Sequence, residues 1–239
     1  METVATLEVE GLGRRYGEFD ALQALDLVIE PGECVALIGH NGSGKTTALR
    51  TIAGLMRPSS GSVRVAGHSV HNEPESLAAR AAMAIMLDTP LLYDDLTVLE
   101  HLQFVALAHG LSGGDELAEQ IDSLLEQLGL TARRTARPPQ LSRGMRQKLQ
   151  LACALIRPHR LLILDEPVVG LDPQAQRLLK ERLIAAKGED KAVLLTTHQL
   201  EFARGLADRA VLLAEGRCVD QGSYDDVVDG PLVREYGLL

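Results

Sequence analysis

The stretch "IGHNGSGKTT", residues 38–47, constrains the fold of this 239-residue chain more than any other. It matches G-x-x-x-x-G-K-[ST], a loop whose glycines let successive backbone N–H groups converge on phosphate oxygens. The apolar run "CVALI" (34–38) precedes it. A helical pattern follows, with these residues expected to face inward: Ala48, Leu49, Ile52 and Leu55. A strand, this loop and a helix in that order predict an α/β chain that binds a nucleoside triphosphate.

Within this loop, two side chains have specific expected roles. Lys45 is expected to reach the β- and γ-phosphates, and Thr46 to hold Mg²⁺. The helix N-terminus adds favourable partial positive charge. The predicted nucleotide-binding residues are therefore Gly39, His40, Asn41, Gly42, Ser43, Gly44, Lys45, Thr46 and Thr47.

Two later strand ends supply groups suited to phosphoryl chemistry. The run "LLILDEP" (161–167) ends in Asp165, which can orient Mg²⁺ through its water shell, and Glu166, which can polarise an attacking water. The run "LLTTHQLE" (194–201) places His198 where it can contact the γ-phosphate and position that water. We therefore predict Glu166, His198 and Lys45 as the catalytic residues.

Composition narrows the class of partner. The net charge of −9 argues against a nucleic-acid binder, because phosphate contacts need a surplus of Lys and Arg. The three cysteines are widely spaced and are expected to be buried, reduced thiols. Neither a signal peptide nor a run of about 18 apolar residues is evident, so we expect a cytoplasmic protein whose membrane role depends on a partner.

Hydropathy patterning predicts the architecture. Short apolar runs alternating with amphipathic helices indicate a mostly parallel sheet with flanking helices, and these runs lie at 34–38, 83–87, 161–164, 192–196 and 210–213. The first ~30 residues and "GSVRVAG" (61–67) alternate and predict an antiparallel β subdomain. A helical insertion, 89–155, is expected between the core segments 1–88 and 156–239. Its two apolar stripes are Leu117, Ile121, Leu124, Leu125 and Leu128, and Leu149, Ala152, Cys153 and Ile156.

With these motifs in this order, almost the whole chain resembles the ATP-binding subunits of ABC transporters. The family's Walker A motif corresponds to 39–47 and its Walker B motif to 161–166. The resemblance implies that His198 is the switch histidine and that Tyr16, in "RRYGEFDAL" (14–22), stacks on adenine. As an isolated tyrosine, Tyr16 would more often be a packing residue. The implied D-loop consists of Gly170, Leu171 and Asp172.

Two segments resemble the family's LSGGQ signature. "LSGGDELAEQ" (111–120) has the better spelling, but Leu111 lies 54 residues before Asp165, whereas Leu141 of "LSRGMRQKLQ" lies 24 before it. The shorter spacing matches the family, and we expect 111–115 to be a turn that opens a helix. The implied signature, which would grip the ATP of a second subunit, is Leu141, Ser142, Arg143, Gly144 and Met145.

The chain departs from the family pattern at the loop that enters the helical insertion. Asp88 stands where the family has a glutamine, and Arg143 and Met145 replace a glycine and a glutamine of the signature. Asp88 either substitutes for the glutamine, and can then approach Mg²⁺ or its water, or weakens coupling and hydrolysis.

The resemblance implies an ATPase subunit that powers a separate transmembrane permease, most like those of two-component exporters for drugs, haem or similar substrates. It also implies a homodimer, or a pseudo-dimer, with two ATP molecules sandwiched at its interface, held at the inner face of the cell membrane through the permease. The alternatives are a soluble non-transport ABC ATPase and a catalytically weak regulatory subunit.

Overall fold

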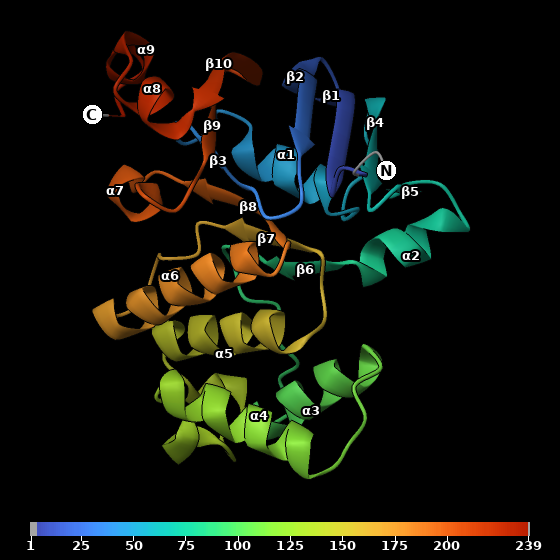
Figure 1. Ribbon diagram of the computed structural model, residues 1–239, viewed down its shortest axis with the longest axis vertical. Helices are drawn as coiled ribbons and strands as arrows, with labels where there is room; N and C mark the ends of the chain where they lie inside the picture. The colour runs from blue at the N-terminus through green and yellow to red at the C-terminus, as the bar shows by residue number, and fades with distance from the viewer. Residues whose placement is uncertain (1–3, 239) are drawn as a thin grey trace. The chain divides into compact units, whose positions relative to one another are not determined.

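The computed structural model describes residues 4–238, which cluster into two compact units (Figure 1). Unit 1 comprises the described residues up to Ile85, His159–Glu166 and those from Leu183 onward. Unit 2 comprises Met86–Pro158 and Pro167–Arg182. Unit 2 thus includes a segment after the Walker B motif that the expected helical insertion, 89–155, does not.

The elements alternate as the hydropathy pattern predicts. The strands are β1 (Leu7–Tyr16), β2 (Phe19–Ile29), β3 (Cys34–Ile38), β4 (Ser60–Val65), β5 (His68–Ser69), β6 (Met83–Met86), β7 (Leu161–Asp165), β8 (Ala192–Thr197), β9 (Arg209–Ala214) and β10 (Arg217–Ser223). The α-helices are α1 (Lys45–Ile52), α2 (Glu75–Ala81), α3 (Val98–Ala108), α4 (Asp115–Gln127), α5 (Arg143–Ile156), α6 (Pro173–Gly188), α7 (Leu200–Ala203), α8 (Tyr224–Val228) and α9 (Pro231–Glu235). Short 3₁₀ turns span Thr131–Arg133 and Pro138–Gln140.

Two sheets form the framework of unit 1. One has the order β2-β1-β4-β5 and is antiparallel, as the alternating N-terminal pattern predicts. The other has the order β10-β9-β3-β8-β7-β6, and β3 pairs in parallel with both β8 and β9. Strands β3, β7 and β8 are buried along their whole length, which explains why they read as continuous apolar runs rather than alternating ones.

Helix α1 packs against strands of both sheets, and its inner face joins one hydrophobic core. Ala48, Leu49 and Ile52 are buried there as predicted. Leu55 is not: it is 52% exposed, so the expected fourth inward position is wrong. The helix ends at Ile52, and Gly54 turns the chain with a φ of +73° before Leu55 can continue the stripe.

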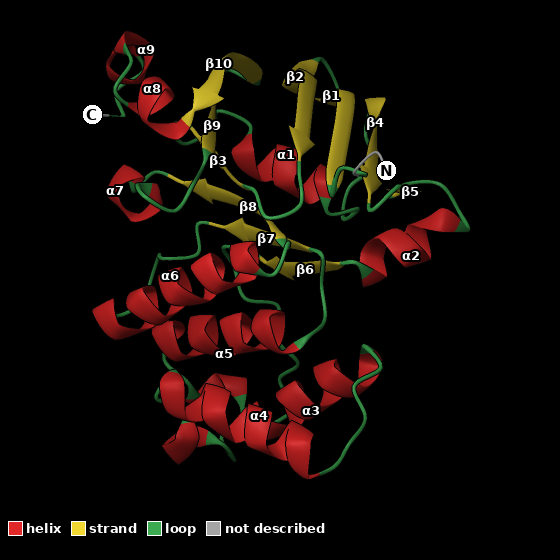
Figure 2. Cartoon of the chain, viewed as in Figure 1, coloured by secondary structure: helices red, strands yellow, loops and turns green. Residues whose placement is uncertain are grey.

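Unit 2 is helical, and residues 87–160 contain no strand (Figure 2). Helices α3, α4 and α5 pack on one another. Thr97 and Glu100 form a capping box at the start of α3, each satisfying a backbone N–H of the other. All five leucine and isoleucine positions of the α4 stripe are buried, and on α5 only Cys153 of the predicted stripe is partly exposed. Across the described residues, no helix combines the length and apolar character needed to span a membrane.

Candidate functional site

Strand register in unit 1 brings the predicted phosphate and acid groups to one edge of the sheet. Ile38, the last residue of β3, pairs with Thr197 at the end of β8. Asp165, the last residue of β7, pairs with Thr196. Because these strands are parallel, the segments that follow them all leave from the same carboxyl edge. This is where ligands bind in open α/β sheets.

The phosphate loop connects β3 to α1 and is organised around Lys45. Its ammonium donates hydrogen bonds to the carbonyls of Gly39 at 2.7 Å and His40 at 3.0 Å. Burial lowers the pKa of Lys45, and the nearby carboxylates of Glu166 and Asp165 oppose that shift. The lysine is thus held across the loop as a compact cation, as phosphate binding requires.

Glycine is favoured at three positions of the loop for different structural reasons. At Gly39, where φ is +154°, a Cβ atom would lie 2.3 Å from the carbonyl oxygen of Leu213. At Gly44, where φ is +105°, it would lie 2.7 Å from the carbonyl oxygen of Ala21. Gly42 also has positive φ, +84°, yet a Cβ there would meet no described atom within 4 Å. Packing therefore requires the first two glycines, whereas backbone conformation alone favours the third.

The other residues of the phosphate loop differ in exposure. His40, Asn41 and Thr46 are exposed, and Thr47 is partly exposed. Ser43 is fully buried, and its hydroxyl has no hydrogen-bond partner among the described residues. The hydroxyl lies against Gly39, where an added Cβ atom would be 2.5 Å from Ser43 Oγ.

Asp165 lies at the centre of a small hydrogen-bonded cluster. Its Oδ1 accepts from the hydroxyl of Thr196 at 2.7 Å and from that of Thr46 at 3.4 Å. The Thr196 hydroxyl also accepts from the backbone N–H of Glu166 at 2.9 Å. Thr196 therefore fixes both acidic residues, a role that its local sequence does not indicate, although the threonine directly precedes the Thr197-His198 pair.

Glu166 is oriented by His198. Its Oε2 accepts a hydrogen bond from His198 Nδ1 at 2.8 Å and a longer one from the His198 backbone N–H at 3.3 Å. Glu166 itself has a φ of +48°, which is uncommon for a residue with a side chain. Strained backbone of this kind clusters at functional sites, which makes Glu166 a candidate functional residue.

The donor set at this edge fits Mg²⁺. The Thr46 hydroxyl and the Asp165 carboxylate are hard oxygen ligands 3.4 Å apart. Within residues 4–238 there is no group of three or more His, Cys, Asp or Glu side chains suited to a metal. A cation bound here would thus take most of its ligands from phosphate oxygens and water, as Mg²⁺ usually does.

Tyr16 lies at the end of β1 and is 45% exposed. The guanidinium of Arg14 lies 4.8 Å from its ring centroid, and its hydroxyl donates to the sulfur of Met56 at 3.5 Å. These contacts hold the ring in place by packing and a cation–π interaction. Stacking on adenine stays a prediction for this residue.

The predicted signature opens α5 in unit 2. The Ser142 hydroxyl accepts from the backbone N–H of Met145 at 3.2 Å and so caps the helix. Leu141 is buried, and Arg143 is exposed. A Cβ at Gly144 would lie 2.8 Å from the carbonyl oxygen of Gly170, which brings the predicted D-loop against the signature within this unit.

The segment 111–114, with its better LSGG spelling, is built differently. Residues 111–113 have no regular structure, and α4 begins at Asp115 after Gly114, whose φ is +138°. No side chain caps this helix, and the acidic Asp115 and Glu116 occupy its first turn. Those carboxylates suit the helix dipole but would repel a phosphate.

Two departures from the family pattern meet in unit 2. Asp88 and Arg143 line the same cavity, of about 350 Å³, together with Asp94, Pro138 and Arg146. Carboxylates and guanidinium groups thus face one space. Thr46 and Asp165, the groups suited to Mg²⁺, belong to unit 1, and a role for Asp88 at the metal stays a prediction.

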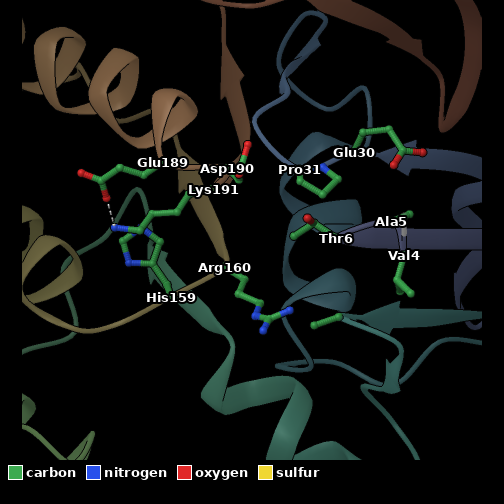
Figure 3. A pocket seen from close by; sticks show the side chains of 11 residues that line it. Val4, Ala5, Thr6, Glu30, Pro31, His159, Arg160, Glu189, Asp190 and Lys191 are labelled. Atoms are coloured by element: carbon green, nitrogen blue, oxygen red, sulfur yellow. Dashed lines mark hydrogen bonds and ion pairs between the residues drawn. The ribbon is translucent and has the colours of Figure 1, made fainter. Parts of the chain in front are cut away.

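A second cavity, of about 860 Å³, lies in unit 1 at the amino ends of the parallel strands (Figure 3). In Figure 3 a dashed line joins the Glu189 carboxylate to the Lys191 ammonium, and these groups lie 2.6 Å apart. The lining mixes acids and bases and includes no residue of the predicted site. It therefore defines no evident ligand class.

These features together define a P-loop nucleotide-binding fold with an acidic pair and a histidine at its carboxyl edge. A protein-family model described as "ABC transporter" matches residues 22–169. The chain is 36% identical over 228 residues to Nod factor export ATP-binding protein I of Cupriavidus metallidurans, which covers 95% of this chain and 74% of that relative.

Solved structures agree. The ATP binding subunit of an ABC transporter superposes with a TM-score of 0.86 and 38% identity over 98% of this chain and 94% of that chain. The ATP-binding cassette MJ0796, solved as a dimer in a post-hydrolysis state with ADP and Pi, superposes with a TM-score of 0.80 and 25% identity over 91% and 98% of the two chains. The chain belongs to the ATP-binding subunits of ABC transporters.

Proposed function

We propose that this protein hydrolyses ATP and couples the reaction to transport through a separate transmembrane permease. The contact that carries the proposal is the 2.8 Å hydrogen bond between His198 and Glu166, beside a complete phosphate loop in the same unit. It supplies an oriented carboxylate for the attacking water and a histidine next to it.

The groups of unit 1 have separate roles in binding and hydrolysing ATP. Lys45 and the loop N–H groups bind the β- and γ-phosphates, and Glu166 polarises the water while His198 positions the γ-phosphate. Thr46 and Asp165 would hold Mg²⁺, which neutralises developing phosphate charge when bound. Thr196 keeps Asp165 and the backbone of Glu166 in place through its hydroxyl. The water is thereby oriented before reaction rather than during it.

We propose that the predicted signature binds the nucleotide held by a second copy of this chain. Support comes from the first turn of α5, which carries Arg143 and Arg146 and no acidic residue. A related cassette is a dimer with ADP and Pi. ATP binding would then close a homodimer, and hydrolysis would remove the γ-phosphate contact that holds it closed.

Export is the proposed direction because the chain is similar to a Nod factor export protein. In this view the protein lies at the cytoplasmic face of the membrane, bound to the permease through unit 2 near residues 88–105. The transported molecule would be recognised by the permease rather than by this subunit.

The test compares the parent with Glu166→Gln, which keeps the shape of the side chain but cannot act as a base. The parent should hydrolyse ATP in the presence of Mg²⁺, and the variant should lose at least about 100-fold in turnover. In size-exclusion chromatography with ATP, the variant should accumulate as a dimer. Glu116→Gln, at an exposed position on α4, is the matched control and should behave as the parent.

Two results would contradict the proposal. A Glu166→Gln protein that stays monomeric with saturating ATP would exclude the sandwich dimer. A parent that binds ATP without hydrolysing it, even with membranes containing its permease, would indicate a regulatory subunit instead.

A further inference from the structure

The loop after the Walker B strand is tied to the signature helix by an ion pair. Lys148, on α5, places its ammonium 2.5 Å from Oδ2 of Asp172, the last residue of the predicted D-loop. The lysine side chain is only 15% exposed, so the pair is shielded on that side. The interaction with Lys148 holds the pKa of Asp172 below its ordinary value.

Asp172 also begins the following helix. Its other oxygen, Oδ1, accepts from the backbone N–H of Ala175 at 2.9 Å and so caps α6. One carboxylate therefore joins the end of the D-loop, the start of α6 and the middle of α5. The negative charge of Asp172 is needed for the ion pair with Lys148, whereas the cap of α6 needs only an oxygen acceptor.

Contacts to backbone carbonyls secure the rest of the loop. The Gln176 side chain donates to the carbonyl of Leu171 at 3.1 Å and to that of Val168 at 3.4 Å. Gly144 packs so closely on the Gly170 carbonyl that a methyl group at 144 would lie 2.8 Å from it. The segment Pro167–Arg182 accordingly clusters with the helical unit 2, whereas Glu166, the residue before it, belongs to unit 1.

We propose that Lys148 and Asp172 are a positioning pair that fastens the D-loop, 170–172, to the signature helix so that both face a second subunit as one surface. Neither residue touches the reacting atoms in this scheme. Their effect on turnover rests on the proposed function, because it requires the signature to act in trans. The fastening itself is a property of the single chain.

Fastening is tested first, in the isolated protein, by amide hydrogen exchange read by mass spectrometry. Lys148→Met removes the charge and keeps most of the apolar stem, and Asp172→Asn removes the charge and keeps the cap acceptor. Both variants should raise exchange in peptides covering 168–176 by about three- to tenfold. Lys148→Arg should restore the parent pattern, because a guanidinium can still pair with the carboxylate.

The chain offers a matched control in unit 1. Lys187 pairs with Asp208 at 2.8 Å, with side-chain exposures of 23% and 46% against 15% and 50% for Lys148 and Asp172. Lys187→Met therefore removes a comparable lysine–aspartate pair and should leave exchange in 168–176 unchanged. Unchanged exchange there in Lys148→Met and Asp172→Asn would overturn the proposal, as would an equal rise in the control.

Turnover is measured next. Lys148→Met and Asp172→Asn should each lower kcat by about three- to tenfold with KM for ATP unchanged, and the double variant should fall no further than either single one. Additive losses would overturn the proposal. If the parent shows neither ATP turnover nor ATP-dependent dimers, the proposed function fails, and the exchange result still decides the fastening.

Discussion

His198 donates a hydrogen bond from Nδ1 to Oε2 of Glu166 at 2.8 Å, and its backbone N–H approaches the same oxygen at 3.3 Å. Because an ionised carboxylate only accepts hydrogen bonds, Nδ1 is the donor in this pair. The histidine thus orients the proposed general base.

Replacing His198 with alanine should lower kcat for ATP hydrolysis by roughly 100-fold, because Glu166 would lose the contact that orients it. The affinity for ATP should change little, since the phosphate loop is intact. Steady-state kinetics and nucleotide-binding titration measure the two effects. Turnover within twofold of the parent would remove His198 from the mechanism.

Alanine variants of two glycines in the phosphate loop should differ in stability. Gly39→Ala places a methyl group 2.3 Å from the Leu213 carbonyl, so we expect a loss of several kcal/mol in the free energy of unfolding, or failure to fold. Gly42→Ala meets no described atom, and only its φ of +84° opposes it, a penalty of about 1 kcal/mol. Thermal unfolding measures both; equal destabilisation would contradict this reading of the loop.

Most of the strand framework follows from the sequence, because β3, β7 and β8 are buried on both faces and must be apolar throughout. The edge strand β10 is partly exposed and shows no such run, so the pattern does not predict it. The prediction that Leu55 faces inward is wrong because hydrophobic periodicity cannot detect that Gly54 turns the chain.

The candidate site divides in the same way. The phosphate loop and the residues Asp165, Glu166 and His198 lie in local motifs and can be predicted. The part played by Thr196 depends on strand register, and the link between Lys148 and Asp172 depends on tertiary packing. Neither leaves a signal in the residues around it.

The two unusual residues that line one cavity, Asp88 and Arg143, should act together. We expect Asp88→Ala to lower ATP turnover, because a carboxylate facing two guanidinium groups would be lost. Asp88→Gln and Arg143→Gly, which restore the family pattern one at a time, should each lower turnover. Their combination should recover part of it, with a coupling of about 1 kcal/mol.

A double-mutant cycle on turnover, with thermal unfolding alongside, measures that coupling. Independent effects would mean that the two departures are unrelated. If Asp88→Gln and Asp88→Ala both match the parent, Asp88 does not take the place of the family glutamine.

The cysteines should differ in reactivity. Burial raises the pKa of the Cys34 thiol to about 12 from its ordinary value of 9.0, so its thiolate fraction at pH 8 falls by about a thousandfold. Burial also raises the pKa of Cys218, but this residue is partly exposed. Iodoacetamide at pH 8, read by mass spectrometry, should label Cys218 well before Cys34. In denaturant the two should react alike, and equal labelling of the native protein would contradict the burial argument.

Ser142 and Ser112 occupy equivalent places in the two LSGG-like segments, and their variants should decide which segment binds nucleotide. Ser142→Ala removes the cap on α5, so we expect about 1 kcal/mol less stability together with lower turnover. Ser142→Asp keeps an acceptor for the cap but sets a negative charge where a γ-phosphate would bind. It should therefore remain stable and yet fail to form ATP-dependent dimers in the Glu166→Gln background.

Ser112 is exposed and caps no helix, so Ser112→Ala and Ser112→Asp should match the parent in stability, turnover and dimerisation. Loss of dimers with Ser112→Asp but not with Ser142→Asp would transfer the signature to residues 111–115, because only a segment that faces the partner's phosphate is sensitive to added negative charge.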